Sequence, residues 1–554
     1  MKLSSVSNSS DWLLEGPWLP LFMALIVHCL GLLNGFTFDD FSAVLEHPVV
    51  SGGEPFWRVV YYDFLGKPLG EWTLTLRPVM TLLYALGWAI WGANPFCFHL
   101  MTLVAFLGVV VLGQRLFKLW LSPRLAMLAT LFFSAMAIHV SCVASIAFGS
   151  GTFALLFSLM AFHWGLQGYL GRAIFAYLAA MMCKEASVLM PLWLVAHLYL
   201  KEGFDSLKPQ KKGMLPISLL CVGGVYVLLR LWWLPIEYAK LVPFADNPLL
   251  AIDSFWVRCW VPFVLLGTYL SKIFIPADFL ADYTYSSIPM TLDLSEPLGW
   301  VGVSFCLIQL GSAFYLLRKR FLRHSLEKVL LFSTCGFWLS YVIPSNTVFL
   351  STVLMAERLF LTPSLWLTLW LFACGGLLSE KVPRLRLHLS IAAVVFLLLQ
   401  VPGAQQRTFE WKNNFTLFRS MVRVSPANVR GQLYLSMEYA KKRRWKEVIW
   451  HFGLALRGRS SFPDGFILAT LGGQQGFLKG FSNKKYAPWS FPLTKEQRKW
   501  RVERKLRLLP AILNYQNRND KHFQAFYQKL TAKFGDRAGS ILLALTKEHE
   551  NSGY

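Results

Sequence analysis

Two adjacent carboxylates, Asp39 and Asp40, follow directly on the first long apolar run of the chain, residues 17–36. Charged side chains this close to a bilayer are costly unless they face water or a partner, so the pair is a candidate functional site. A carboxylate can act as a general base toward an attacking hydroxyl, and two neighbouring carboxylates raise one another's pKa toward the range that such a base needs. The alternative interpretation is that Asp39 only caps the apolar helix.

Three cations lie at predicted helix ends and are candidate ligands of an anionic group: Arg77, Lys184 and Arg358. The planar guanidinium group of arginine suits bidentate contact with phosphate oxygens. Glu185 and Glu357 stand beside two of these cations and are candidates to orient them or to hold a second substrate. The alternatives are interfacial snorkelling for Arg77 and Lys184, and a structural Glu–Arg pair for Arg358.

The elements that must position these residues are membrane helices. Of the 554 residues, 55% are hydrophobic and 15% are charged, and the mean hydropathy is +0.44. Soluble domains carry roughly 25% charged residues, and many apolar runs here approach the length needed to cross a hydrocarbon core of roughly 30 Å. In lipid only helices and closed barrels satisfy the backbone, so we expect an all-α polytopic helix bundle. The first apolar run has no cleavage signal after it and is expected to be retained.

The net charge of +23 does not indicate a nucleic-acid partner. Lys and Arg cluster in short loops between apolar runs and in the C-terminal tail, as the positive-inside bias and anionic lipid predict. The nine cysteines have irregular spacing and form no CxxC pair, so neither a metal site nor a disulfide framework is expected.

Loop charge predicts about eleven spans, with the N-terminus inside and the C-terminus outside. The first loop (37–95) and a loop at 235–296 are then external. The apolar run 255–275 would break the parity, so we expect it to pack on or dip into the outer face. One or two further spans nearby would restore parity equally well. The predicted spans are 17–36, 96–114, 124–138, 145–165, 173–183, 187–201, 214–234, 297–317, 327–343, 359–378 and 389–402.

Two short apolar segments are expected near the external face. Pro78 opens the run that ends at Trp91, and the aromatic content of this part of the loop suits a helix at the interface. The run 173–183 is too short to span alone and ends in Cys183-Lys-Glu185. A broken helix at membrane depth is tolerated where it lines a cavity, so we expect Lys184 to point toward the same external cavity as Asp39.

The chain divides into a membrane module, residues 1–402, and an extracytoplasmic helical domain, residues 403–554. Residues 428–457 read as one helix pair with small and large apolar residues at tetratricopeptide-like positions. A repeat array needs about three units for stability, so this domain is expected to depend on the membrane module.

Several stretches together resemble the transmembrane-and-tetratricopeptide O-mannosyltransferases, within the GT-C class of polyprenyl-phosphate-sugar glycosyltransferases. The resemblance covers nearly all of residues 20–460 and implies an inverting transferase. One of Asp39 and Asp40 would be its base, and Arg77, Lys184 and Arg358 would bind the phosphate of a polyprenyl- or dolichyl-phosphate donor. The sugar would be mannose-like and the acceptor a protein Ser/Thr hydroxyl or a glycolipid. The stretches are Phe38-Asp-Asp-Phe-Ser-Ala-Val, Leu76-Arg-Pro78, Gly92-Ala-Asn-Pro-Phe-Cys-Phe-His-Leu100, His139 with Val143-Ala-Ser-Ile-Ala-Phe-Gly149, Cys183-Lys-Glu185, Ala356-Glu-Arg358, Leu361-Thr-Pro-Ser364 and the region 411–455.

The chain departs from the family at two motifs, His-Pro-Val-His-Thr-Glu and Gly-Arg-x-Asp. The aligned residues are Ala137-Ile-His139-Val-Ser141 and Gly149-Ser-Gly-Thr152, so a second acidic site, and a metal held with it, lack support. His139 alone is more typical of a buried structural histidine than of a ligand.

Two rival functions stay open. One is a transporter or flippase of lipid-linked sugars, which predicts inverted repeats and paired broken helices. The other is an inactive relative that acts as a scaffold. For a multi-pass protein with an external site, we expect a bacterial inner membrane facing the periplasm, with the endoplasmic reticulum facing the lumen as the alternative.

Overall fold

The computed structural model describes residues 16–69, 75–208, 213–233, 247–252, 254–283, 287–318, 325–348, 350–351, 353–444 and six positions between 447 and 455. Within these residues every regular element is a helix, and the only β pairing is an isolated bridge between Tyr62 and Pro68. This confirms the predicted all-α architecture. The chain forms two compact units.

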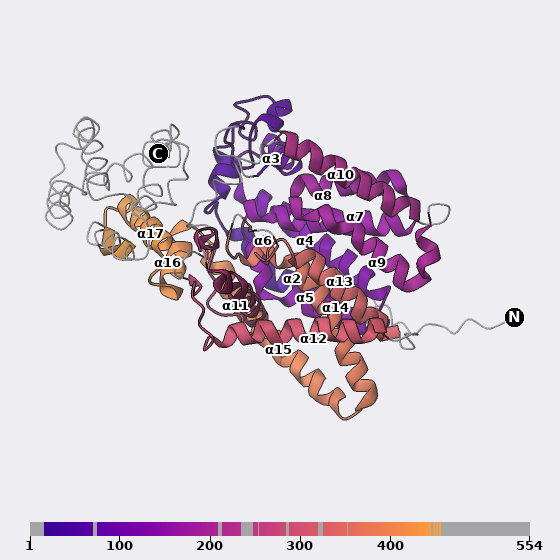
Figure 1. Cartoon of the computed structure of the whole chain (residues 1–554). Helices are drawn as coiled ribbons and strands as arrows, with labels where there is room; N and C mark the ends of the chain where they lie inside the picture. The colour runs from indigo at the N-terminus through magenta and orange to yellow at the C-terminus, as the bar shows by residue number, and fades with distance from the viewer. Residues whose placement is uncertain are drawn as a thin grey trace, which may run out of the picture. The chain divides into compact units, whose positions relative to one another are not determined.

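The first unit comprises Met1–Ala239, Phe255–Ala281 and Thr291–Thr416, and holds all of the predicted site residues. Figure 1 shows its helices packed in a bundle, in which α8 lies against both α7 and α10. Its helices are α2 (Trp18–His28), α3 (Pro78–Trp91), α4 (Pro95–Lys118), α5 (Pro123–Ala135), α6 (Val140–Val143), α7 (Ser150–Leu166), α8 (Leu170–Cys183), α9 (Met190–Glu202), α10 (Met214–Trp233), α11 (Phe255–Phe274), α12 (Pro297–Arg318), α13 (Ser325–Tyr341), α14 (Leu361–Lys381) and α15 (Leu385–Glu410).

Local sequence signals set where several of these helices begin. Proline occupies the first turn of α3, α4 and α5, a position where its fixed φ suits the helix and its missing N–H costs nothing. Asn94 caps α4 by accepting a hydrogen bond from the Phe96 N–H, and Gly92, at a φ of 61°, ends α3. The chain can therefore turn sharply between α3 and α4 because glycine tolerates a positive φ.

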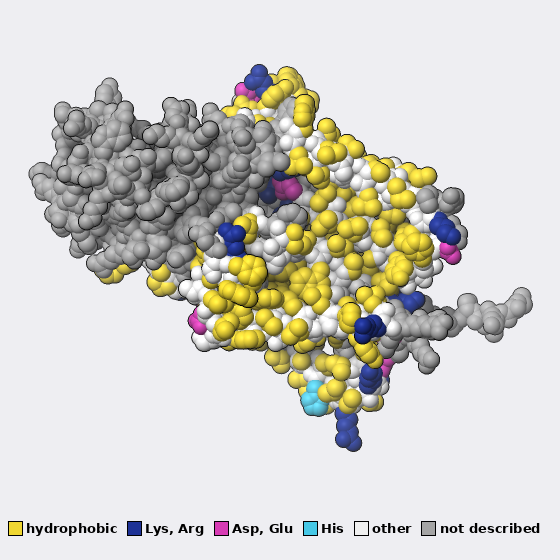
Figure 2. Space-filling view, viewed as in Figure 1, with side chains coloured by type: hydrophobic (Ala, Val, Ile, Leu, Met, Phe, Trp, Pro, Cys, Tyr) yellow, Lys and Arg dark blue, Asp and Glu magenta, His cyan; other side chains and the backbone are white. Residues whose placement is uncertain are grey.

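Seven helices of the described residues are long and apolar enough to cross a membrane, and α5 together with the short helices after it forms a bent pair that makes an eighth candidate. The outer helices α10, α12 and α15 bury only a small part of their apolar length, and Leu228, Leu307 and Leu398 are each more than two-thirds exposed. Hydrophobic side chains cover much of the visible face of the described part in Figure 2, with Lys and Arg mainly toward its edges. The chain is thus a multi-pass membrane protein.

Two details differ from the sequence-based expectations. The run predicted at 255–275 to lie on the outer face is one continuous 20-residue helix, α11, which by length and composition is a candidate span. It packs closely on α12, and apolar side chains along it such as Val261, Leu265 and Tyr269 are buried, so the run is part of the helix bundle. The boundary expected at 402/403 falls inside α15, and the first unit extends to Thr416.

The second unit comprises Lys240–Ser254, Asp282–Met290 and Leu417–Tyr554. Helix α16 (Asn414–Val424) enters it and α17 (Val429–Lys441) lies within it. The Asn428 side chain caps α17 by accepting from the Gly431 N–H, and Arg430 pairs with Asp282. A helix thus lies where the first member of the expected pair was predicted, and its tetratricopeptide-like character stays a prediction. Most of the second, and residues 456–554, lie outside the described residues.

Candidate active site

Asp40 and the three predicted cations meet one short buried segment, residues 145–151, hereafter the central turn. It consists of the 3₁₀ turn η5 (Ala147–Gly149) and the start of α7, and all of its residues are buried. Its side chains are small apart from Ile146 and Phe148. Small side chains let other segments approach the backbone closely, so the central turn is suited to hold groups that come from distant parts of the chain.

Asp40 joins the first loop to the central turn. Its side chain is fully buried, and its Oδ1 accepts hydrogen bonds from the Ser145 hydroxyl (3.1 Å) and the Ala147 N–H (2.7 Å). Its Oδ2 accepts from the N–H and the hydroxyl of Thr37 at 3.0 and 3.3 Å. Burial raises the pKa of Asp40 to about 6, although these hydrogen bonds lower it. The four hydrogen bonds make Asp40 a structural link between the two segments.

Asp39 is held beside this link but is only half-buried. The preceding residue, Phe38, has a φ of 52°, which is uncommon for a residue with a bulky side chain. Its N–H donates to the Asn414 side chain at 2.8 Å, and its ring meets the Phe148 ring at 6.1 Å. Backbone strain of this kind persists where the surroundings enforce it, and it gathers at functional sites. Because Asp39 is half-buried and Asp40 is fully buried, Asp39 has the more accessible carboxylate of the predicted pair.

The three predicted cations also reach the central turn. Arg77 donates to the Ser150 hydroxyl at 3.2 Å, and the Arg358 guanidinium lies 3.8 Å from the centre of the Phe148 ring. A Cβ atom added at Gly151 would be 3.2 Å from the Lys184 amine, so glycine leaves the room that this amine occupies. The structure thus brings Arg77, Lys184 and Arg358 together around one turn.

Glu185 forms ion pairs with two arginines, Arg230 and the predicted cation Arg77. Its carboxylate lies 2.9 Å from Arg230 and 3.7 Å from Arg77. Burial by itself would raise the pKa of Glu185, but the charges of Arg77 and Arg230 outweigh it and the pKa is lowered. Glu185 therefore stays ionised. The cations gathered near it, Arg77, Lys184, Arg230 and Arg358, outnumber this one carboxylate.

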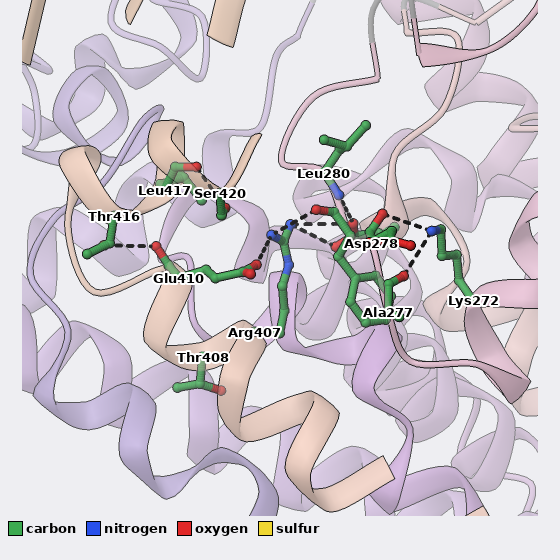
Figure 3. A network of polar contacts seen from close by, with 12 residues as sticks. Lys272, Ala277, Asp278, Leu280, Arg407, Thr408, Glu410, Thr416, Leu417 and Ser420 are labelled. Atoms are coloured by element: carbon green, nitrogen blue, oxygen red, sulfur yellow. Dashed lines mark hydrogen bonds and ion pairs between the residues drawn. The ribbon is translucent and has the colours of Figure 1, made fainter. Parts of the chain in front are cut away.

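Two predicted residues lie in other surroundings. Glu357 is buried and pairs with Arg407 of α15 at 3.1 Å, in the region shown in Figure 3. His139 is buried between the rings of Phe106 and Phe133, with its Nε2 2.8 Å from the Ser364 hydroxyl. Its role as a supporting site residue stays a prediction.

Arg230 and Arg407 were not predicted from the sequence. Each is an isolated arginine near the end of a long apolar run, 214–234 and 389–402 with its extension, and ionisable residues in such runs are functional candidates. That signal was present in the sequence, but it names no partner. Among the described residues, no group of three or more His, Cys, Asp or Glu side chains is placed to hold a metal ion.

The fold and the site define a class: an all-α multi-pass membrane protein with a loop carboxylate beside clustered cations. Proteins similar to this chain in sequence have names that state an activity. Human protein O-mannosyl-transferase TMTC4 is 24% identical over 505 residues, which covers 79% of this chain and 67% of that protein. Protein O-mannosyl-transferase TMTC3 of Mus musculus is 23% identical over 443 residues, covering 74% and 48%. Protein O-mannosyl-transferase F38B6.6 of Caenorhabditis elegans is 23% identical over 419 residues, covering 73% and 56%.

These relatives confirm the predicted resemblance to the transmembrane-and-tetratricopeptide O-mannosyltransferases. The chain spans about half to two-thirds of the length of the curated relatives it matches. No family model matches the chain, and no solved structure matches it.

Proposed function

We propose that this protein is a membrane glycosyltransferase that moves a mannose-like sugar from a polyprenyl- or dolichyl-phosphate carrier to a protein hydroxyl. The observation that supports it is the convergence on the central turn. Asp40, whose neighbour Asp39 is the proposed base, accepts a hydrogen bond from Ser145, Arg358 lies on Phe148, and Arg77 donates to Ser150. A base next to a cation cluster is the arrangement that a displacement at a sugar phosphate requires.

In the proposed reaction, Asp39 takes the proton of the acceptor hydroxyl while the hydroxyl oxygen attacks the anomeric carbon. The bond between that carbon and the phosphate oxygen breaks, and the lipid phosphate leaves with the electron pair. Arg77, Lys184 and Arg358 stabilise the negative charge that develops on the phosphate, and fixed charges of this kind supply a large part of enzymatic rate enhancement. A single displacement inverts the anomeric configuration.

The reaction would take place on the extracytoplasmic or luminal face, where the first loop lies in the charge-based topology. The relatives named above are animal proteins, and they give no support to a bacterial inner membrane. A eukaryotic internal membrane with its lumen facing the first loop therefore becomes the first compartment to test. Their names also favour a protein acceptor over a glycolipid.

The test uses the full chain in detergent or vesicles with radiolabelled dolichyl-phosphate mannose and a Ser/Thr-rich peptide. We expect labelled peptide with dolichyl-phosphate mannose as the donor. No labelled peptide should form when free radiolabelled mannose is supplied in its place. Absence of transfer from dolichyl- and polyprenyl-phosphate sugars would contradict the proposal. Transbilayer movement of the same lipids by the reconstituted chain would then favour the flippase.

The protonation of Lys184 gives the proposal a pH dependence. Burial, followed by the charges of Arg77 and Arg358, lowers the pKa of Lys184 to about 8. The ammonium form, which binds phosphate, is present below this pH and is lost above it. We expect kcat/KM for the donor to fall as pH rises through about 8, since this parameter reports groups of the free enzyme.

Replacing lysine by arginine separates this effect from others. In Lys184→Arg the charge persists to much higher pH because guanidinium does not deprotonate in proteins. The alkaline fall in kcat/KM should therefore disappear in the variant. A fall at the same pH in both proteins would assign it to another group.

A further inference from the structure

Arg407, near the end of α15, is a fully buried cation with two carboxylate partners. Its guanidinium lies 3.1 Å from Glu357 and 2.8 Å from Glu410, and it donates to the Phe279 carbonyl at 3.5 Å. Figure 3 shows Arg407 between Glu410 on its own helix and the segment around Asp278 and Leu280. None of these residues belongs to the proposed catalytic set of Asp39, Arg77, Lys184 and Arg358, and the sequence left the role of Glu357 open.

A buried ion pair is weak grounds for stability, because taking two charges out of water costs about as much as their attraction returns. Apolar residues of similar volume often stabilise such a position as well or better. The ion pair is therefore better explained by the residues that it holds in place than by its contribution to stability.

One chain of contacts leads from Arg407 to Arg358. Glu357 also accepts from the Leu280 N–H at 2.8 Å, and it directly precedes Arg358. The residue before it, Ala356, is fixed by Tyr269, whose hydroxyl donates to the Ala356 carbonyl and accepts from its N–H, both at 3.1 Å. With residues 356 and 357 fixed, the side chain of Arg358 has a defined starting point beside the central turn.

A second chain of contacts leads to the aromatic ring under Arg358. The guanidinium of Arg407 lies 5.5 Å from the centre of the Trp411 ring, and Trp411 is fully buried. Trp411 meets Phe148 edge to face at 5.6 Å, and Phe148 supports the Arg358 guanidinium at 3.8 Å. Both the backbone of Arg358 and the ring on which it lies thus depend on Arg407.

We propose that Arg407 is a positioning residue for the lipid-phosphate donor: through Glu357 and through Trp411 and Phe148 it fixes Arg358 where the phosphate binds. This inference rests on the proposed function, since it takes Arg358 as a phosphate ligand. Arg407 itself contacts neither substrate.

A double-mutant cycle on direct binding tests it. Binding of a fluorescent polyprenyl phosphate to the full chain in detergent is measured for wild type, Arg407→Lys, Arg358→Gln and the double variant. Lysine keeps the charge but cannot bridge two carboxylates with a planar fork. We expect Arg407→Lys to weaken binding by about tenfold, within the range for coupled neighbours, and the double variant to bind no more weakly than Arg358→Gln alone.

Arg430→Lys is the matched control, because Arg430 also pairs with a carboxylate, Asp282, but belongs to the second unit. It should bind like wild type. Independent effects of Arg407→Lys and Arg358→Gln, which multiply in the double variant, would overturn the inference. Failure of the wild type to bind polyprenyl phosphate would contradict the proposed function instead.

Thermal unfolding of each variant is followed in the same detergent. If Arg407→Lys does not fold, Glu410→Gln replaces it in the cycle, because Glu410 is less buried than Glu357 and its loss leaves the Glu357 contact intact. The same non-additivity with Arg358→Gln is expected, with a smaller weakening. Independent effects there would also overturn the inference.

Discussion

Asp39→Asn is expected to reduce sugar transfer by a factor of about 10²–10⁴, the usual contribution of a general base, with little change in thermal unfolding. Asparagine is nearly the same size but cannot accept the proton of the acceptor hydroxyl. Asp39 is half-buried, while its neighbour Asp40 makes the four hydrogen bonds that fix the loop. The loop should therefore keep its conformation in this variant.

The measurement is initial transfer rate against donor and acceptor concentration, with donor binding as a second readout. Donor binding should persist, because the proposed phosphate ligands are untouched. Glu54→Gln is the matched control: Glu54 lies in the same loop and pairs with the exposed Arg58, and its loss should leave the rate unchanged. Full activity of Asp39→Asn would remove Asp39 from the mechanism and leave Asp40 as the candidate base.

Asp40→Ala is expected to destabilise the fold strongly, whatever it does to catalysis. Alanine removes the acceptor for the buried N–H groups of Thr37 and Ala147 and for the Ser145 hydroxyl. Each unsatisfied buried donor costs about 1–3 kcal/mol, so the two backbone groups alone cost on the order of 2–6 kcal/mol. Thermal unfolding in detergent should show a large fall in the midpoint, and retention of the wild-type midpoint would contradict the structural role of Asp40.

The Asp40→Asn substitution should destabilise the fold less than Asp40→Ala, since its one remaining oxygen satisfies one of the two backbone N–H groups.

The stability of the wild type should also depend on pH through Asp40. Because burial raises the pKa of Asp40 to about 6, above its value of 3.8 in the unfolded chain, the folded state holds the proton more tightly. Its contribution to stability is therefore greatest below about pH 4 and falls as pH rises to about 6. This part of the pH dependence should be missing in Asp40→Ala.

Several elements could be predicted from local patterns. The apolar runs predicted the helices, and Cys183-Lys-Glu185 correctly predicted where the short helix α8 ends. The prediction for 255–275 relied on counting loop charges, which cannot distinguish a helix on the membrane surface from one buried against α12. Arg407 was visible as an isolated charge, but its partners Glu357 and Glu410 depend on how α15 packs, which spacing does not reveal.

By itself the sequence determined the all-α membrane class, the carboxylate pair and the three candidate cations. Membrane helices and their charged ends are local consequences of composition, and hydrocarbon allows few other structures. The tertiary structure alone decided that Asp40 is a buried link and Asp39 the accessible carboxylate, because burial and hydrogen bonding at adjacent residues come from the distant central turn. It also decided that Ser150, where the family has an arginine, and the neighbouring Gly151 receive Arg77 and Lys184 from the ends of other helices. The physical reason is that small side chains leave space, and only the packed chain shows which charges fill it.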